Sequence, residues 1–161
     1  MLEKQTVNLE VFRCRCKCCD KEFNVLDFPN FEYGRRLLRT EDGENCVLQI
    51  CFEDNVFSEV SNMVDNILEG RKLTEIEKAK CFDEVYGLAC DPIDGKIINA
   101  SKIIICRYCS SRETERFEYR PPKNININVD IVTHKDWNKK TIQEKQKIIS
   151  KALEKCIENQ S

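Results

Sequence analysis

Two Cys-x-x-Cys elements are the residues of this chain best suited to chemistry. They are Cys16-Lys17-Cys18-Cys19 and Cys106-Arg107-Tyr108-Cys109. In a tight turn, two-residue spacing lets both sulfurs reach one ion, and two such turns complete the tetrahedral four-sulfur shell that zinc accepts. Four thiolates leave no coordination position for water, so the expected site is structural and not catalytic. We therefore expect one structural Zn²⁺ ion, bound by Cys16, Cys19, Cys106 and Cys109.

Two further cysteines close to the first pair could act as metal ligands in its place. Cys14 and Cys18 lie beside it, so either could replace Cys16 as a ligand, although the spacing favours Cys16 with Cys19. Reduced thiols without a metal, and a redox or iron–sulfur role, are the alternatives to zinc. The other cysteines fall on apolar stripes or in turns, and we interpret them as ordinary buried thiols. They are Cys46, Cys51, Cys81, Cys90 and Cys156.

The residues around the two pairs, 10–24 and 102–118, resemble the zinc-ribbon family, in which two such knuckles sit on neighbouring hairpins. Two features depart from that family. Asp20 and Ser110 stand where a glycine usually follows the second cysteine, which predicts that each exit turn is strained or differently shaped. The knuckles are also separated by 86 residues, far more than is usual, and we interpret the gap as an insertion.

Hydrophobic periodicity predicts a mixed α+β fold. Helical spacing of apolar residues predicts helices over residues 56–68, from a capping box at Thr74 to Gly87, and after a second capping box at Thr141. Pro121-Pro122 is expected to separate two strands, because proline cannot donate to a strand ladder. The expected strands are 6–12, 37–39, 47–52, 96–99, 102–105, 116–119 and 125–131.

We expect a single domain over residues 1–161 with an α+β architecture. Its length allows one core, and its composition, 41% hydrophobic and 34% charged, is that of a globular protein. The expected parts are a zinc ribbon at 6–24 and 100–120, a large inserted hairpin and helical segment at 25–99, and a C-terminal strand plus helix at 121–161.

Acidic residues are unevenly distributed along the chain. The net charge is only −2, but residues 41–95 contain 14 acids and 4 bases, and residues 41–70 contain eight acids and no base. Such a segment would repel phosphates and attract a basic protein, although a merely solvated face is the alternative interpretation. We expect the partner-binding residues to be Glu41, Asp42, Glu44, Glu53, Asp54 and Glu59.

Other function classes have less support in the sequence. The only histidine, His134, has no cysteine near it, and no glycine-rich phosphate loop is present, so we do not expect an enzyme. Basic residues surround the knuckles, but acids are interleaved with them, which makes nucleic-acid binding the alternative. No apolar run is long enough to span a membrane and the N-terminus has no apolar signal region, so we expect a cytoplasmic protein.

The segment Val132-Thr133-His134-Lys135-Asp136-Trp137-Asn138, followed by Glu144-Lys145, resembles C-terminal segments of bacterial immunity proteins from toxin–immunity systems. The resemblance implies a protein that neutralises a toxin domain, often a basic nuclease, by covering its active site. We therefore expect a non-enzymatic, zinc-stabilised protein-binding protein that acts as an immunity protein against a basic toxin. The alternative is a nucleic-acid-binding zinc-ribbon protein.

Overall fold

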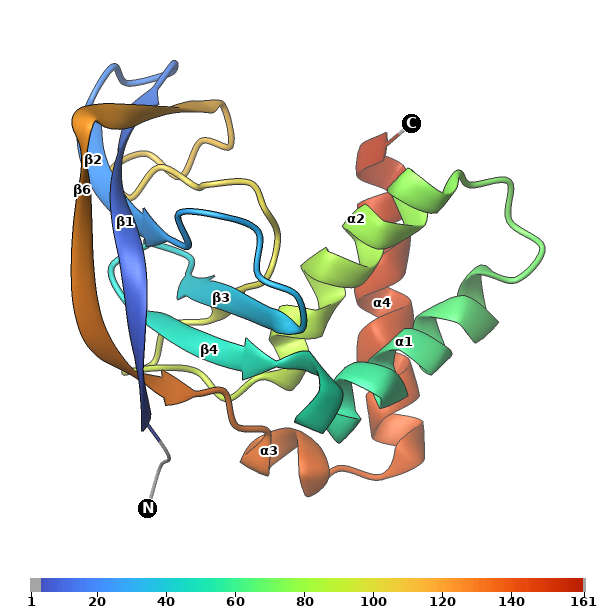
Figure 1. The fold of residues 1–161 in the computed structure, drawn as a ribbon. Helices are drawn as coiled ribbons and strands as arrows, with labels where there is room; N and C mark the ends of the chain where they lie inside the picture. The colour runs from blue at the N-terminus through green and yellow to red at the C-terminus, as the bar shows by residue number, and fades with distance from the viewer. Residues whose placement is uncertain (1–3, 161) are drawn as a thin grey trace.

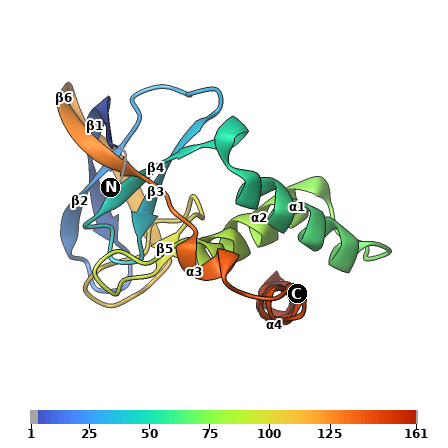
Figure 2. The ribbon, with the colours of Figure 1, turned by 90° about the horizontal axis from the view of Figure 1, so that it is seen from below.

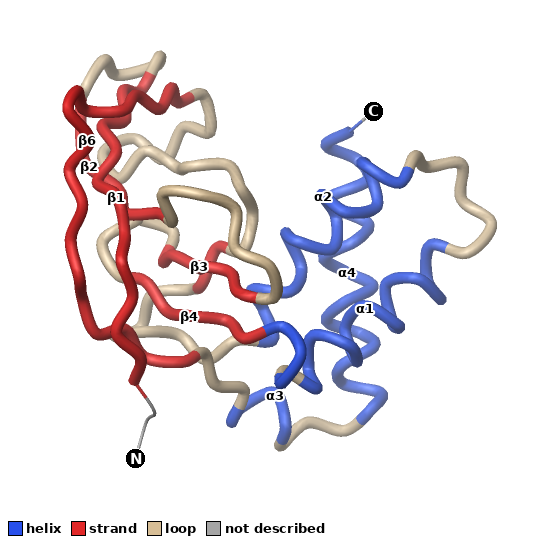
Figure 3. Tube along the Cα trace, viewed as in Figure 1, coloured by secondary structure: helices blue, strands red, loops and turns tan. Residues whose placement is uncertain are grey.

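Residues 4–160 are described in a computed structural model, and they form a mixed α+β fold (Figure 1). The strands lie on one side of the molecule and the helices gather on the other (Figure 3). No helix within these residues is long and apolar enough to cross a membrane. The elements are β1 Lys4–Cys16, β2 Glu22–Asp27, β3 Arg35–Thr40, β4 Cys46–Ile50, the 3₁₀ turn η1 Cys51–Glu53, α1 Asn55–Leu68, α2 Glu75–Tyr86, η2 Gly87–Ala89, β5 Ile98–Asn99, β6 Thr114–Ile131, α3 Lys135–Asn138 and α4 Ile142–Gln160.

The sheet brings distant parts of the chain together. Its six strands follow the order β2-β1-β6-β4-β3-β5, and all neighbours are antiparallel except β4 and β6. β1 pairs with β6 from Lys4 opposite Asp130 to Cys16 opposite Thr114. Near its end, β6 also pairs with β4, and in this way it joins the β1–β2 hairpin to the β3–β4 hairpin.

β6 is one continuous strand, so the expected division at Pro121-Pro122 is wrong. Its pairing with β1 moves from Glu118 opposite Phe12 directly to Lys123 opposite Val11. The β6 residues between these two pairs, including both prolines, form a bulge without partners in β1. Proline lacks an N–H donor, and a bulge is one of the few places in a sheet where that donor is not required.

Residues 102–105 form a loop and not the expected strand. Side chains shape this loop, because Asn99 Nδ2 donates to the carbonyl of Ile103 at 3.0 Å and Ser101 Oγ accepts from the amide of Ile103 at 3.1 Å. These local bonds satisfy backbone groups that a strand would pair with a neighbour. The other expected strands correspond to β1, β3, β4 and β5, with shifted ends.

The helices α1, α2 and α4 form a layer beside the sheet (Figure 2). They pack around one apolar cluster, which buries the stripe expected for residues 56–68. A side-chain oxygen accepts a first-turn N–H at the start of each of these helices, which satisfies a donor that the helix cannot pair internally. The capping residues are Asp54, Thr74 and Thr141.

The short helix α3 fixes the start of α4 against α1. Trp137 of α3 is 1% exposed, and its indole N–H donates to Glu59 of α1 at 2.5 Å. The same carboxylate accepts from Lys145 Nζ of α4 at 3.0 Å. Glu59 therefore joins α1 to both of the helices that follow β6.

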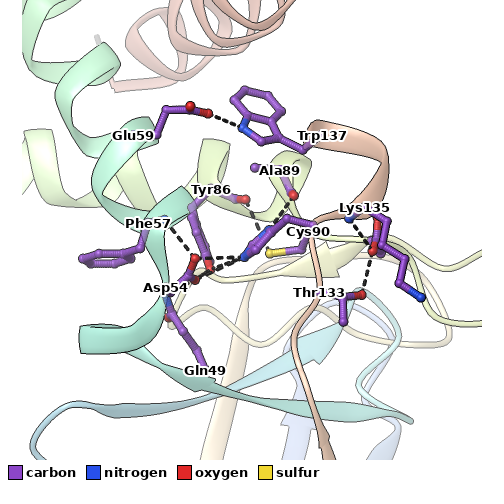
Figure 4. Close-up of polar contacts among 12 residues, drawn as sticks. Gln49, Asp54, Phe57, Glu59, Tyr86, Ala89, Cys90, Thr133, Lys135 and Trp137 are labelled. Atoms are coloured by element: carbon purple, nitrogen blue, oxygen red, sulfur yellow. Dashed lines mark hydrogen bonds and ion pairs between the residues drawn. The ribbon is translucent and has the colours of Figure 1, made fainter. Parts of the chain in front are cut away.

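The N-terminus of α1 carries a buried polar network (Figure 4). Asp54 accepts hydrogen bonds from Gln49 Nε2 at 3.1 Å and from the hydroxyl of Tyr86 in α2. His134, between β6 and α3, places Nε2 3.1 Å from the Asp54 carboxylate and Nδ1 2.7 Å from the carbonyl of Ala89. A carboxylate and a carbonyl both accept hydrogen bonds, so this arrangement favours the protonated imidazole, in which both ring nitrogens donate.

The network shifts the pKa values of both charged partners. Burial raises the pKa of Asp54, but hydrogen bonds from His134 and Tyr86 outweigh burial and lower that pKa to about 2. Burial lowers the pKa of His134, but the bonds to Asp54 and to the Ala89 carbonyl outweigh it, so the pKa of His134 is raised above 6.5. The ion pair therefore contributes its full stabilisation between about pH 4 and about pH 6.5, the unfolded-state pKa values of the two groups.

We expect the stability that His134 contributes to fall as the pH rises. Below about pH 6.5 the group binds a proton in both the folded and the unfolded chain, and its contribution is lost as the pH passes through the raised folded-state pKa. The difference in free energy of unfolding between wild type and His134→Gln should therefore be largest below about pH 6.5 and shrink as the pH rises above it. Urea titrations at a fixed metal concentration measure it, and a difference that does not change with pH contradicts the ion pair.

Candidate metal centre

The two cysteine pairs form turns with the same backbone hydrogen bonds. In each turn the N–H of the first cysteine donates to the carbonyl five residues later, at 3.0 Å for Cys16 and 2.9 Å for Cys106. The N–H four residues later donates back to the carbonyl of that cysteine, at 2.9 Å from Asp20 and 2.8 Å from Ser110. Two segments far apart in the sequence therefore present their cysteines in one geometry.

Asp20 and Ser110 adopt the left-handed backbone conformation, with φ of 64° and 62°. Glycine reaches this conformation without strain, whereas another L-residue pays about 1–2 kcal/mol. Both residues therefore adopt the conformation that a glycine would adopt, which fits the expectation of a strained exit turn, and the two turns share the same backbone hydrogen bonds. In the first turn Arg15 Nε donates to Asp20 Oδ1 at 2.7 Å, and both side chains of this ion pair are exposed.

The four sulfur atoms of Cys16, Cys19, Cys106 and Cys109 converge on one point. All lie within 4.8 Å of one another, with 3.5 Å between Cys16 Sγ and Cys109 Sγ and 3.6 Å between Cys19 Sγ and Cys106 Sγ. A tetrahedral site with metal–sulfur bonds of about 2.3 Å has sulfur–sulfur edges of about 3.8 Å, whereas a disulfide bond is about 2.05 Å long. The group can therefore hold a metal ion, and these sulfur–sulfur distances are too long for disulfide bonds.

Backbone amides point at two of the sulfurs. Cys19 N donates to Cys16 Sγ at 3.5 Å, and Tyr108 N donates to Cys106 Sγ at 3.4 Å. The amide of Cys19 is the main reason that the pKa of Cys16 is lowered to about 6. Because the thiolate is the form that binds a metal, the turn prepares Cys16 to act as a ligand.

The sheet brings the second turn to the first. Cys16 is the last residue of β1 and pairs with Thr114, the first residue of β6, which follows the second turn. Arg107, between the two ligands of the second turn, donates through Nη2 to the carbonyl of Asn24 in β2 at 2.8 Å. The buried cluster around the centre contains Phe12, Cys14, Cys16, Phe23, Val25 and Cys106.

Cys14 and Cys18 lie outside the group of four sulfurs. Cys14 is buried in the apolar cluster, and burial raises the pKa of its thiol. Cys18 is in the first turn but is exposed to solvent. The structure therefore brings together the four cysteines expected from the spacing and leaves both competitors apart from them.

The six acidic residues expected to bind a partner fall into two separate groups, three on the turn between β3 and β4 and three at the opposite end of β4 and in α1. Asp42 of the first group lies 2.6 Å from Lys96 Nζ. Asp54 and Glu59 of the second group accept hydrogen bonds within the helical layer, Asp54 from the amide of Phe57 and Glu59 from the indole of Trp137. Of the six, those exposed to solvent are Glu41, Glu44 and Glu53.

Three exposed aromatic residues, which the sequence reasoning missed, form a feature that we call the aromatic ridge: Phe31, Tyr33 and Phe52. Phe31 and Tyr33 lie between β2 and β3 and Phe52 lies in η1, and the three are 90%, 80% and 74% exposed. The two segments are tied together, because Cys51 N donates to Gly34 O at 2.8 Å. The rings of Tyr33 and Phe52 are 5.5 Å apart.

Gly34 determines where the ring of Phe52 lies. Its φ is +79°, and a Cβ atom at this residue would come within 2.6 Å of the Phe52 ring. The ring therefore packs directly on the backbone of Gly34. The exposure of two of these residues could have been predicted from the sequence. Phe31 and Tyr33 belong to no apolar face, and they lie in a turn-forming segment, Pro29-Asn30-Phe31-Glu32-Tyr33-Gly34.

A groove of about 810 Å³ begins at Phe31. Basic residues outnumber acidic residues in its lining, and ion pairs such as Arg36–Asp83 at 3.0 Å and Arg116–Asp27 at 2.8 Å neutralise part of the charge. A guanidinium has five N–H donors, so each paired arginine can still donate to a ligand. The basic lining residues are Arg35, Arg36, Arg39, Lys102, Arg112 and Arg116, and the acidic ones are Asp27, Glu32 and Asp83.

Comparison of the chain with protein-family models, with curated proteins and with solved structures finds no match. The function must therefore be inferred from the chemistry of the chain's own residues.

We expect serine substitution of any one of the four clustered cysteines to lower the metal content of the purified protein. Each change leaves three thiolates, and a metal ion would then have to recruit a weaker fourth ligand. Elemental mass spectrometry against protein concentration measures the ratio. Cys18→Ser is the matched control, because Cys18 is an exposed cysteine in the same turn. Loss of metal in Cys18→Ser with full metal content in Cys16→Ser would contradict the ligand assignment.

Proposed function

We propose that this protein is a non-enzymatic binding protein stabilised by a structural zinc ion. Four thiolates at near-tetrahedral spacing are a ligand set typical of structural zinc, and they leave the metal no position for a substrate. The proposal includes a zinc-ribbon arrangement of residues 6–24 and 100–120. Its support is the pair of equivalent turns, the first of which joins β1 to β2.

The aromatic ridge carries the proposal that this protein binds another protein. Exposed apolar patches mark interaction sites, and aromatic side chains are prominent among the residues that dominate interface energies. The Cys51–Gly34 hydrogen bond and the packing of Phe52 on Gly34 place the rings of Phe52 and Tyr33 side by side, which would reduce the conformational entropy that these two rings lose when a partner docks. Burial against a partner is a physical reason for three such side chains to gather where they add nothing to the core.

We further propose that the partner is a basic protein, specifically a toxin domain that this chain neutralises. Glu53 is exposed next to Phe52, and exposed acids raise the rate of association with a basic partner. The resemblance of residues 132–138 to immunity proteins supports the toxin class. In the structure this segment is partly internal, since the side chain of His134 is 9% exposed and Trp137 is 1% exposed, whereas Lys135, Asp136 and Asn138 are exposed. His134 and Trp137 make contacts within the chain, so we place the proposed contact surface at the aromatic ridge.

A second candidate function is binding of single-stranded nucleic acid in the groove. The observation that favours it is the excess of basic side chains beside Phe31, because such sites combine a cationic groove with aromatic rings on which bases stack. Lys102 and the arginines of the lining would contact phosphates, and Phe31 would stack on a base. This candidate ranks below protein binding because most of the arginines already pair with carboxylates of the chain.

We expect Phe52→Ala to weaken binding of the protein partner by about 30-fold, which corresponds to the loss of a hot spot of about 2 kcal/mol. The partner is captured on immobilised wild type, identified by mass spectrometry, purified and titrated against both proteins by calorimetry. Ile76→Ala is the matched control, because Ile76 is 70% exposed in α2, away from the ridge. Equal affinity of wild type and Phe52→Ala for the captured protein contradicts the ridge as its binding surface.

The second candidate makes a separate prediction about salt. If the groove binds nucleic acid, Lys102→Ala should weaken binding of a labelled single-stranded oligonucleotide and reduce the slope of log K against log salt by about 0.7, the value for one phosphate contact. Fluorescence anisotropy from low to physiological salt measures it. Lys151→Ala, an exposed lysine on α4, should leave the slope unchanged. Wild-type protein that binds no oligonucleotide at low salt would eliminate this candidate.

A further inference from the structure

Two cysteines outside the metal centre, Cys81 and Cys156, meet between the helices α2 and α4. Their sulfur atoms are 2.7 Å apart, although the residues are 75 positions apart in the sequence. Both are buried, at 0% and 4% exposure, in the apolar cluster of the helical layer. The sequence predicts two ordinary buried thiols, and the packing of α2 on α4 brings them together.

The distance between these sulfurs is unlike that at the metal centre. Sulfurs suited to share a metal ion lie 3.5 and 3.6 Å apart at the closest contacts of the four-cysteine group. The separation of the Cys81 and Cys156 sulfurs lies between the contact distance of unbonded sulfurs and the length of a disulfide bond, about 2.05 Å, so the two side chains are directed at each other.

We propose that Cys81 and Cys156 are a site of reversible covalent modification, a disulfide that joins α2 to α4. The proposal is independent of the proposed function. Three observations support it: the sulfur–sulfur distance, the burial of both residues and the direct packing of α2 on α4.

The reaction uses a low-molecular-weight disulfide, such as oxidised glutathione, as the oxidant. One protein thiol loses its proton and attacks a sulfur of the small disulfide, which forms a mixed disulfide and releases one small thiolate. The second protein thiol, after losing its proton, attacks the protein sulfur of the mixed disulfide and releases the second small thiolate. Two electrons pass from the protein to the oxidant, and the two protons leave with the two small thiols.

Cys156 is the cysteine that the oxidant reaches first. It lies in the last turns of α4, which ends at Gln160, whereas Cys81 lies in the middle of α2. The end of a helix opens far more often than its middle, so opening of the last turns of α4 would expose the Cys156 thiol, which is 4% exposed in the closed helix. When the turn closes again, it returns the mixed disulfide to the neighbourhood of Cys81.

The bond would close a long loop, which restricts the unfolded chain, and it would hold α4 on the helical layer. Because the four sulfurs of the metal centre lie on the sheet side of the molecule, the bond can form without removing a metal ligand. A glutathione pool at cytoplasmic poise reduces many disulfides, so we expect the bond to form when that poise becomes more oxidising.

The test is to incubate the metal-loaded protein with oxidised glutathione, alkylate the remaining thiols and digest with trypsin without reduction. We expect a linked pair of peptides, 81–96 and 156–161, with the metal content unchanged. Peptide 81–96 also contains Cys90, so the digest is repeated on Cys90→Ser, which should give the same link. The oxidised wild type should melt at a higher temperature than the reduced protein, and the same treatment should not shift the melting temperature of Cys156→Ala.

Two results would overturn the proposal. One is recovery of Cys81 and Cys156 as alkylated thiols after an oxidant concentration that already releases the metal. The other is a linked pair that disappears in Cys90→Ser. The peptide measurement is made on wild-type protein, so it decides the matter even where Cys156→Ala folds poorly.

Discussion

The meeting of four sulfur atoms from two distant segments is the constraint on which the sheet side of this protein depends. The first pair ends the long strand β1 and the second pair precedes the long strand β6, so the centre sits where the ladder between them begins. Binding of a structural zinc is worth about 10–16 kcal/mol in small finger peptides, as much as the whole net stability of many domains. An ion held there would fix the register of β1 against β6 and offset the strain at Asp20 and Ser110.

The helical side depends on a different interaction, the buried ion pair between Asp54 and His134. Asp54 caps α1, and His134 follows the end of β6, so their contact sets where the chain leaves the sheet and enters the helices. Removing one member of such a pair leaves a buried charge without its partner, which is far more damaging than losing an exposed ion pair. The two sides of the molecule therefore have separate sources of stability, and the aromatic ridge is built beside the strand β4 that leads from one to the other.

Local patterns predicted the three long helices and the four-cysteine group, because helical periodicity, caps and ligand spacing each depend only on residues that are close in the sequence. Features that depend on distant partners were not predictable in this way. Pro121-Pro122 is accepted within β6 because the register with β1 shifts there. Asp54 and Glu59 resembled surface acids, but their partners His134 and Lys145 lie 80 and 86 residues away. The exposure of Phe31 and Phe52 likewise depends on how two loops meet at Gly34.

The most direct test of the central claim is X-ray absorption at the zinc edge of the purified wild-type protein. The proposed centre requires one zinc ion with four sulfur neighbours at about 2.3 Å and no nitrogen or oxygen in the first coordination shell. Fewer than four sulfur neighbours, or a light-atom ligand in the shell, would contradict a closed structural site. Protein that folds with no bound metal would contradict the dependence of the sheet side on the four sulfurs.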